Sequence, residues 1–168
     1  MSSGRHYNIQ ELISLFYEDL YRYAYRSIGC SSDAEDLTQD TYCKAHAKIG
    51  QLRDHSLAKS WLFGIMTNLI RKRYNDNKRL RIVSISEDYD PAQTESEKTD
   101  DADLDALQKA LNQLPDVYRL PIILYFFGKF SYREIAEQME MPIGTVMSRL
   151  NRAKVLLKEL LTQAGGRE

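Results

Sequence analysis

The side chains whose types and spacing could do chemistry gather first near the C-terminus. Thr145, Ser148, Arg149 and Arg152 recur at helical spacing and share one face, which holds hydrogen-bond donors and no acid. Arginine can grip a guanine edge through two parallel hydrogen bonds, and hydroxyls can hold phosphates. The pattern predicts a helix face that binds the major groove of DNA. On spacing alone, an ordinary helical hairpin with a solvated basic face stays open as the alternative. The same basic strip is extended by Lys154 and Lys158.

A helix-turn-helix would position that face. Ser131 and Glu134 have the spacing at which two side chains satisfy free amides at a helix start. Pro142 lacks an amide hydrogen, so we expect it at the first position of the next helix, with the turn at Glu140 and Met141. Residues 130–161 therefore predict two helices joined by a tight turn, a unit that enters DNA grooves. The second helix should bury a stripe formed by Val146, Leu150, Ala153 and Leu157.

Acidic side chains form a second candidate surface. Asp33, Asp36 and Asp40 are spaced so that they share one stripe of a helix, with Gln39 beside it. One interpretation is a solvated face whose acids lie favourably near the helix N-terminus. The other is a docking surface for a basic partner.

A third candidate surface lies on a long helix expected from about residue 56 to residue 78. Its apolar stripe includes Trp61, whereas Thr67 and Asn68 should face elsewhere. The far end is strongly basic, with Arg71, Lys72, Arg73, Lys78, Arg79 and Arg81. Cations close to a polar loop and exposed side chains are typical of single-stranded nucleic acid binding. A tryptophan on such a helix is more often part of the core.

Local signals predict where the first helices begin and end. Asn8 and Glu11 suit the start of a helix that continues to about residue 28, and Gly29 is placed to end it. Ser32 and Glu35 have capping-box spacing and predict the start of the acidic helix.

Periodicity along the 168 residues predicts an all-α protein with two small helical domains. The net charge of -1 hides segregated charge, because acids accumulate where periodicity disappears. We therefore expect a flexible acidic linker at residues 82–103, between an N-terminal domain of residues 1–81 and a C-terminal domain of residues 104–168. The C-terminal domain should open with a helix that stops at Pro115. Pro121 predicts a kink or a late start in the apolar helix that follows.

Other classes of function lack their usual motifs. Cys30 and Cys43 do not form a CxxC pair, and the three histidines are scattered, so we expect no metal site. A glycine-rich phosphate loop and a nucleophile motif are also missing, which argues against an enzyme, a cofactor and a small-molecule substrate. No apolar run approaches the roughly 20 residues that span a membrane. We expect a cytoplasmic protein that is not itself a membrane protein.

Three stretches together resemble the bacterial RNA polymerase sigma factors, specifically the extracytoplasmic function (ECF) group. DAEDLTQDTY (residues 33–42) is similar to region 2.2 of that family, and SWLFGIMTNLIRKR (60–73) is similar to regions 2.3 and 2.4. LPDVYR (114–119), followed by FSYREIAEQMEMPIGTVMSRLNRAK (130–154), is similar to region 4. The three signatures stand in the family's order and cover nearly the whole chain.

The resemblance implies a role for each surface. Region 2.2 docks on core RNA polymerase, which implies polymerase-binding residues Asp33, Asp36, Leu37, Gln39 and Asp40. The loop before the region 2.3 helix captures a base flipped from the promoter's minus-10 element, which implies the minus-10 DNA-binding residues Asn68, Arg71, Lys72, Arg73 and Trp61. The second helix of region 4 binds the minus-35 element, which implies Thr145, Met147, Ser148, Arg149, Asn151 and Arg152. The chain departs from the family at three positions: Lys72 stands where an acid is frequent, Glu140 where glycine is usual, and Met147 where a basic residue is usual.

The resemblance also implies partners: core RNA polymerase, promoter DNA and an anti-sigma factor. The acidic linker would pass through the polymerase channel. The main rival is a stand-alone regulator that binds operator DNA through the same helix-turn-helix and needs no polymerase.

Overall fold

The computed structural model describes residues 6–84 and 101–166, with side chains to residue 79 in the first range. It contains seven α-helices and, in these ranges, no strand: α1 Ile9–Ile28, α2 Ser31–Lys48, α3 Ala58–Ser84, α4 Ala102–Gln113, α5 Asp116–Phe126, α6 Tyr132–Met139 and α7 Ile143–Gly165. Two short 3-10 turns, Ile49–Gln51 and His55–Leu57, connect α2 to α3. The all-α prediction is confirmed. Most of the predicted linker, residues 85–100, lies outside the described residues.

The ends of α1 follow the local signals. The Asn8 side chain accepts the Glu11 amide, and the Glu11 carboxylate accepts the Asn8 amide. Gly29 ends the helix at φ 80°, and a Cβ at this glycine would approach the Asn112 side chain of α4 to 2.7 Å. A larger residue at Gly29 would therefore be both strained and crowded.

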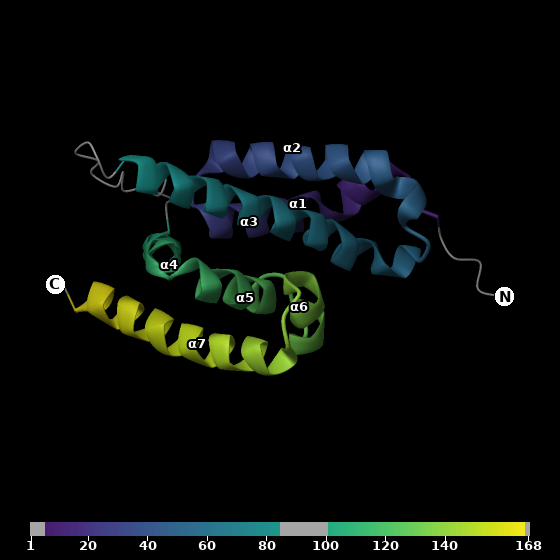
Figure 1. Ribbon diagram of the computed structural model, residues 1–168. Coiled ribbons are helices and arrows are strands. Elements are labelled where there is room, and N and C mark those ends of the chain that lie inside the picture. Colours follow the sequence, from purple (N-terminus) through teal and green to yellow (C-terminus); the bar gives the residue numbers. More distant parts are fainter. Residues whose placement is uncertain (1–5, 85–100, 167–168) are drawn as a thin grey trace.

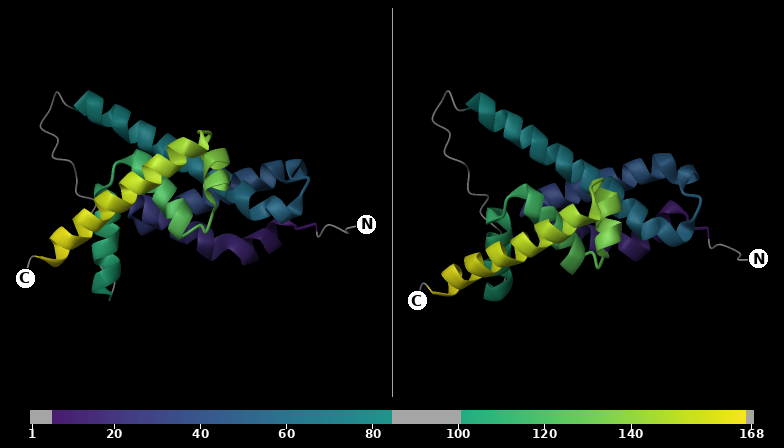
Figure 2. Two further views of the ribbon diagram at one scale, coloured as in Figure 1. Left: turned by 90° about the horizontal axis from the view of Figure 1, so that it is seen from below. Right: turned by 60° about the horizontal axis from the view of Figure 1, so that its bottom comes forward.

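The starts of α2 and α3 differ from the prediction. The capping box at Ser32 and Glu35 is wrong, because α2 already begins at Ser31 and Cys30 precedes it without a side-chain cap. Helix α3 begins at Ala58, after the His55–Leu57 turn, and continues to Ser84. It therefore runs through the expected domain boundary after residue 81, and its C-terminal turns project beyond the other helices (Figure 2).

Helices α1, α2 and α3 form one bundle with a polar contact inside it. The Tyr23 hydroxyl lies 2.9 Å from the Thr67 hydroxyl, and both residues are buried. Tyr23 also stacks on Phe63 at 5.2 Å between ring centroids. Burial raises the pKa of Tyr23 well above its ordinary value. The expectation that Thr67 faces away from the core is thus wrong, because its hydroxyl finds partners within the bundle.

Helices α4 to α7 form a second layer. Helix α5 begins directly after Pro115 and runs through the buried Pro121, so the expected late start is wrong. The capping box of Ser131 and Glu134 is confirmed at the start of α6. Pro142 precedes α7 as its N-cap residue, one position earlier than predicted.

The two layers pack against each other (Figure 1). Helix α1 contacts α4 and α5, and α3 contacts α6. The buried apolar residues of both layers belong to one continuous hydrophobic cluster. Phe63 of α3 meets Phe130, just before α6, edge to face at 5.0 Å. The chain therefore folds as two helical units with a shared interface.

Candidate DNA-binding and docking surfaces

The outer face of α7 brings the predicted DNA-binding residues together. Val146, Leu150 and Ala153 are fully buried, as predicted, and hold the opposite face of the helix on its own domain. The described structure shows no ion pair on this outer face. Of its six predicted residues, Met147, Ser148, Asn151 and Arg152 are exposed, and Thr145 and Arg149 are half-buried. The Ser148 hydroxyl donates to the Thr145 carbonyl at 3.0 Å, so the donors that this face offers to a ligand are chiefly those of Arg149, Asn151 and Arg152.

The turn before α7 sets the angle of that helix. Glu140 adopts the left-handed conformation at φ 52° and ψ 49°. Its amide donates to the Glu137 carbonyl, and the Met141 amide donates to the Ala136 carbonyl. These two bonds are those of a Schellman motif, which normally has glycine at the left-handed position. The tight turn thus forms with glutamate in the strained position.

Lys154 does not extend the outer basic strip. Its ammonium lies 5.1 Å from the centre of the Tyr125 ring and 6.0 Å from that of Phe126, so the side chain is turned towards α5. Together with Lys158 it borders an apolar groove between α5 and α7, which the sequence pattern did not reveal. The groove is lined by Ile122, Phe126, Leu157 and Leu161.

The acidic surface of α2 is smaller than predicted. Asp36, Gln39 and Asp40 are exposed, and the structure shows no ion pair to either aspartate among the described residues. Leu37 is only 4% exposed and belongs to the core. Asp33 pairs with Arg73 of α3 at 2.5 Å. The carboxylates free to dock a basic partner are therefore those of Asp36 and Asp40.

The pairing of Asp33 with Arg73 also changes the basic surface of α3, because each side chain balances the other's charge. Asn68 and Lys72 remain exposed, and Arg71 is half-buried. The three border a shallow polar hollow on α3. Trp61 is half-buried and packs against the core, as its apolar ring favours. The hollow therefore offers both amide and cationic donors on one helix.

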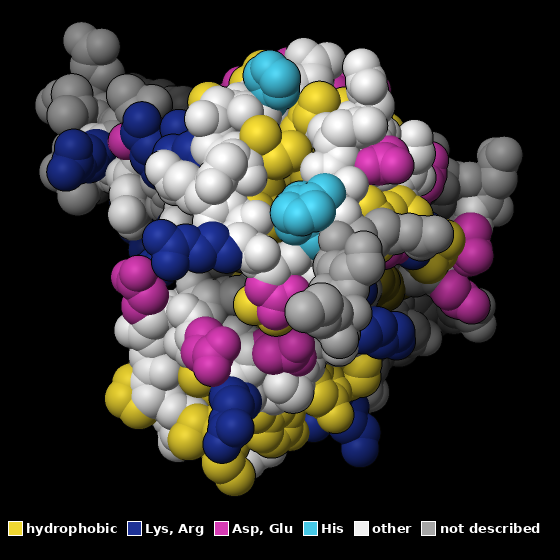
Figure 3. Space-filling model, turned by 90° about the vertical axis from the view of Figure 1, so that its right-hand side faces the viewer, with side chains coloured by type: hydrophobic (Ala, Val, Ile, Leu, Met, Phe, Trp, Pro, Cys, Tyr) yellow, Lys and Arg dark blue, Asp and Glu magenta, His cyan; other side chains and the backbone are white. Residues whose placement is uncertain are grey.

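The segment between α2 and α3 is held in place by polar contacts. The Asp54 carboxylate accepts from the amide and the hydroxyl of Ser56 at 2.9 and 2.6 Å, and these bonds lower its pKa. Nδ1 of His55 accepts the Tyr7 amide at 2.8 Å, and the second ring nitrogen of His55 lies 3.2 Å from His6. The contacts fasten the chain before α1 to this segment. Figure 3 views this end of the molecule, where basic, acidic and hydrophobic side chains intermingle.

A helix-turn-helix with an outer face of donors, joined to a second helical unit with separate acidic and basic surfaces, defines a DNA-binding protein of the transcription-factor class. Residues 12–80 match the family model of sigma-70 region 2, and residues 104–157 match that of sigma-70 region 4. The chain belongs to the sigma-70 family of RNA polymerase sigma factors, within its ECF group.

Individual relatives agree with this assignment. The chain is 33% identical to the ECF sigma factor SigE of Mycolicibacterium smegmatis over 91% of its own length, and spans 61% of that relative. It is 34% identical to the ECF sigma factor EcfG of Rhodopseudomonas palustris, over 83% of this chain and 77% of the relative. A solved structure of the sigma factor RpoE in complex with the anti-sigma factor NepR from Bartonella quintana matches with a TM-score of 0.76 and 33% identity, covering 91% of this chain and 96% of RpoE. In the described residues, no helix is long and apolar enough to cross a membrane.

Proposed function

We propose that the protein directs core RNA polymerase to promoters, with each of its three surfaces in a separate role. The exposed carboxylates of Asp36 and Asp40, with Gln39, bind a basic surface of the polymerase. The donors on the outer face of α7 bind the minus-35 element. The single observation that carries the proposal is that the exposed carboxylates of Asp36 and Asp40, which have no ion pair among the described residues, lie on α2, whereas the exposed donor faces lie on α3 and α7.

The N-terminal unit melts the minus-10 element in this proposal. Flipping a base costs a few kcal/mol of unstacking, which a preformed segment and backbone contacts can offset. The segment around His55 is fixed by the Asp54 and Tyr7 contacts, and Asn68 and Lys72 lie exposed on the helix that follows it. Arg73 would contribute less than its neighbours, because Asp33 already balances its charge.

The proposal extends to partners and to the place of action. The protein performs no catalysis itself, and it acts in the cytoplasm, where polymerase and promoter DNA are found. An anti-sigma factor is a further proposed partner, supported by the similarity to RpoE in its complex with NepR.

Run-off transcription tests the proposal. Bacterial core RNA polymerase is incubated with a pool of promoter fragments, with and without the protein. We expect new, defined start sites only when both proteins are present, and their upstream sequences identify the two promoter elements. Specific gel shifts by the protein alone, without any stimulation of transcription, would instead indicate a stand-alone regulator and leave the acidic face of α2 as a solvated surface.

A further inference from the structure

The segment between α2 and α3 is attached to the chain before α1 through two histidines. Nδ1 of His55 accepts the Tyr7 amide at 2.8 Å, and Nε2 of His55 lies 3.2 Å from Nδ1 of His6. The two imidazole rings meet edge to face, with 4.7 Å between their centres. Tyr7 is half-buried and packs against the hydrophobic core, with its ring centre 5.9 Å from that of His55. His55 therefore joins two parts of the chain that are 48 residues apart.

The two contacts determine where the protons lie on both rings. A backbone amide can only donate, so Nδ1 of His55 must present a lone pair to Tyr7. A neutral imidazole then carries its proton on the other nitrogen, so Nε2 of His55 donates to Nδ1 of His6. That nitrogen of His6 must accept, so it carries no proton. Both hydrogen bonds therefore require both rings to be neutral.

Protonation of either ring breaks one of the two bonds. A protonated His55 carries a proton on Nδ1, which then faces the Tyr7 amide hydrogen, donor against donor. A protonated His6 faces the proton on Nε2 of His55 in the same way. Histidine is the side chain that ordinarily changes its charge between pH 5 and pH 8. The attachment should therefore be present at pH 7.5 and be lost as the pH falls.

Other charged groups on the surrounding elements do not replace these bonds. Within the segment, Arg53 is exposed, and the Asp54 carboxylate lies close enough for its charge to interact with that of His55. Lys59 at the start of α3 donates to a backbone carbonyl of the C-terminal unit, and Glu11 of α1 accepts a backbone amide at the start of its own helix. Asp54 can attract a protonated ring, but it cannot supply the lone pair that the amide has lost.

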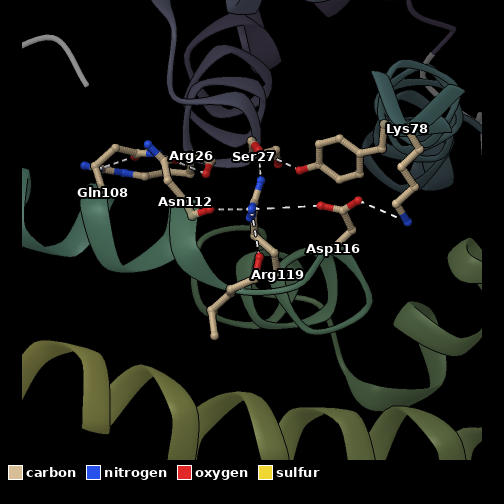
Figure 4. A network of polar contacts seen from close by, with 9 residues as sticks. Arg26, Ser27, Lys78, Gln108, Asn112, Asp116 and Arg119 are labelled. Carbon is tan, nitrogen blue, oxygen red and sulfur yellow. Dashed lines mark hydrogen bonds and ion pairs between the residues drawn. The ribbon is translucent and has the colours of Figure 1, made fainter. Parts of the chain in front are cut away.

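A second polar network, between α1, α3, α4 and α5, is built from other side chains (Figure 4). At its centre, Arg119 of α5 donates to the Ser27 carbonyl of α1 at 3.3 Å, and Lys78 of α3 lies 3.4 Å from the Asp116 carboxylate. The residues labelled in this network include no histidine, and arginine, lysine and aspartate ordinarily keep their charge between pH 5 and pH 8. A response to pH in that range is therefore expected at the segment between α2 and α3.

We propose that His55 is a positioning residue that fixes the segment between α2 and α3 only while its ring is neutral. The neutral ring keeps the chain before α1 attached to this segment, and protonation releases it. The consequence for transcription rests on the proposed function, in which this segment captures the flipped base. A released segment must be ordered again when the base enters, which opposes binding, so promoter melting should decrease as the pH falls.

Nuclear magnetic resonance of the imidazole nitrogens tests the proton positions in the full-length chain. At pH 7.5 we expect the nitrogen shifts of His55 to show the proton on Nε2, whereas His46, exposed on α2, should show a mixture of both neutral forms. Amide hydrogen exchange of Tyr7, corrected for the intrinsic effect of pH, should become about tenfold faster between pH 7.5 and pH 5.5, because a hydrogen bond is lost. A proton on Nδ1 of His55, or unchanged exchange of the Tyr7 amide, would overturn the inference.

Two variants of His55 separate its titration from its role as an acceptor. His55→Asn places an amide oxygen near the position of Nδ1 and does not titrate, so exchange of the Tyr7 amide should stay slow at both pH values. His55→Ala removes the acceptor, so exchange should be fast at both. His46→Asn is the matched control and should keep the pH dependence of the natural protein. Equal pH dependence in the natural protein and in His55→Asn would contradict the role of the His55 proton.

Permanganate footprinting with core polymerase at pH 7.5 and pH 6.0 tests the functional consequence. The decrease in open complexes should be at least about twofold larger for the natural protein than for His55→Asn, and the comparison cancels the pH dependence of the polymerase itself. Equal decreases, in a preparation active in run-off transcription, would overturn the link between His55 and melting. The expected protons and release, in a chain that never stimulates transcription, would support the positioning role of His55 and refute the proposed function.

Discussion

Replacing Glu140 by glycine should stabilise the protein while preserving the helix-turn-helix. A side chain with a Cβ in the left-handed region costs about 1 to 2 kcal/mol, and the φ of 52° at Glu140 lies in that region. Glycine removes this cost, but its greater freedom in the unfolded chain lowers the free energy of unfolding by about 0.5 to 1 kcal/mol. The net gain is about 1 kcal/mol, which should raise the melting temperature by about 2 to 4 °C for a chain of this size.

Thermal unfolding followed by circular dichroism measures the change. Glu140→Ala removes the carboxylate and keeps the Cβ, so its stability should stay close to that of the natural protein. Glu137→Gly, at an exposed position inside α6, should lower stability by about 1 kcal/mol, because glycine there loses helix propensity. Equal stabilisation by Glu140→Ala and Glu140→Gly would refute the role of backbone strain and point to the charge. Transcription from a promoter dependent on its minus-35 element should be unchanged in Glu140→Gly, because the turn keeps its geometry.

Further predictions concern the surfaces and the buried tyrosines. Asp36→Arg with Asp40→Arg should weaken binding to core polymerase at least tenfold in a pull-down titration, because two free carboxylates are reversed. Arg149→Ala should weaken binding to the minus-35 element by about 1 to 3 kcal/mol, the free energy of a base contact with two hydrogen bonds. Transcription that depends on this element should fall accordingly. Asn68→Ala should impair open-complex formation in permanganate footprinting more than closed-complex binding in gel shifts. Burial raises the pKa of Tyr74 to about 12, above its ordinary value of about 10 in the unfolded chain. The free energy of unfolding should therefore keep its full contribution from Tyr74 below pH 10 and lose it as the pH rises from 10 to 12.

Each of these predictions has a matched control. Reversal of two exposed acids elsewhere, Glu18→Arg with Glu137→Arg, should leave polymerase binding intact. Lys158→Ala on α7 and Asn77→Ala on α3 are the controls for the two DNA-binding variants. Equal effects of a test variant and its control would argue against the assigned contact. Absorbance at 295 nm follows tyrosine ionisation, and a Tyr74→Phe variant with an unchanged alkaline titration would contradict the assignment of that group.

Local chemistry in the sequence determined much of the architecture. The capping boxes at Asn8 and Ser131 and the left-handed Gly29 formed as predicted, because each depends on residues within one helical turn. The buried stripe of α7, with Leu150 at its centre, also followed from spacing, since helical periodicity alone separates its two faces. The face predicted to bind DNA therefore lies where the sequence indicated.

Contacts between distant segments were decided by the tertiary structure. The short connection after Gly29 places the start of α2 at Ser31, which moves Ser32 inside the helix and prevents its predicted capping role. Asp33 pairs with Arg73 because the packing of α2 on α3 brings two opposite charges together, forty residues apart in the chain. Neither partner can be identified from spacing within its own helix.

The shared interface of the two units shows the same limit most clearly. Periodicity places Phe63 and Phe130 on apolar faces, but it does not say whether each face is covered by its own unit or by the other. In the folded protein the two rings pack against each other. The Arg119 guanidinium also donates to carbonyls at the ends of α1 and α4. The sequence by itself determined most of the helices, the buried stripe of α7 and the family. Which faces meet was decided only by the tertiary structure, because burial free energy depends on the whole set of surfaces that pack together.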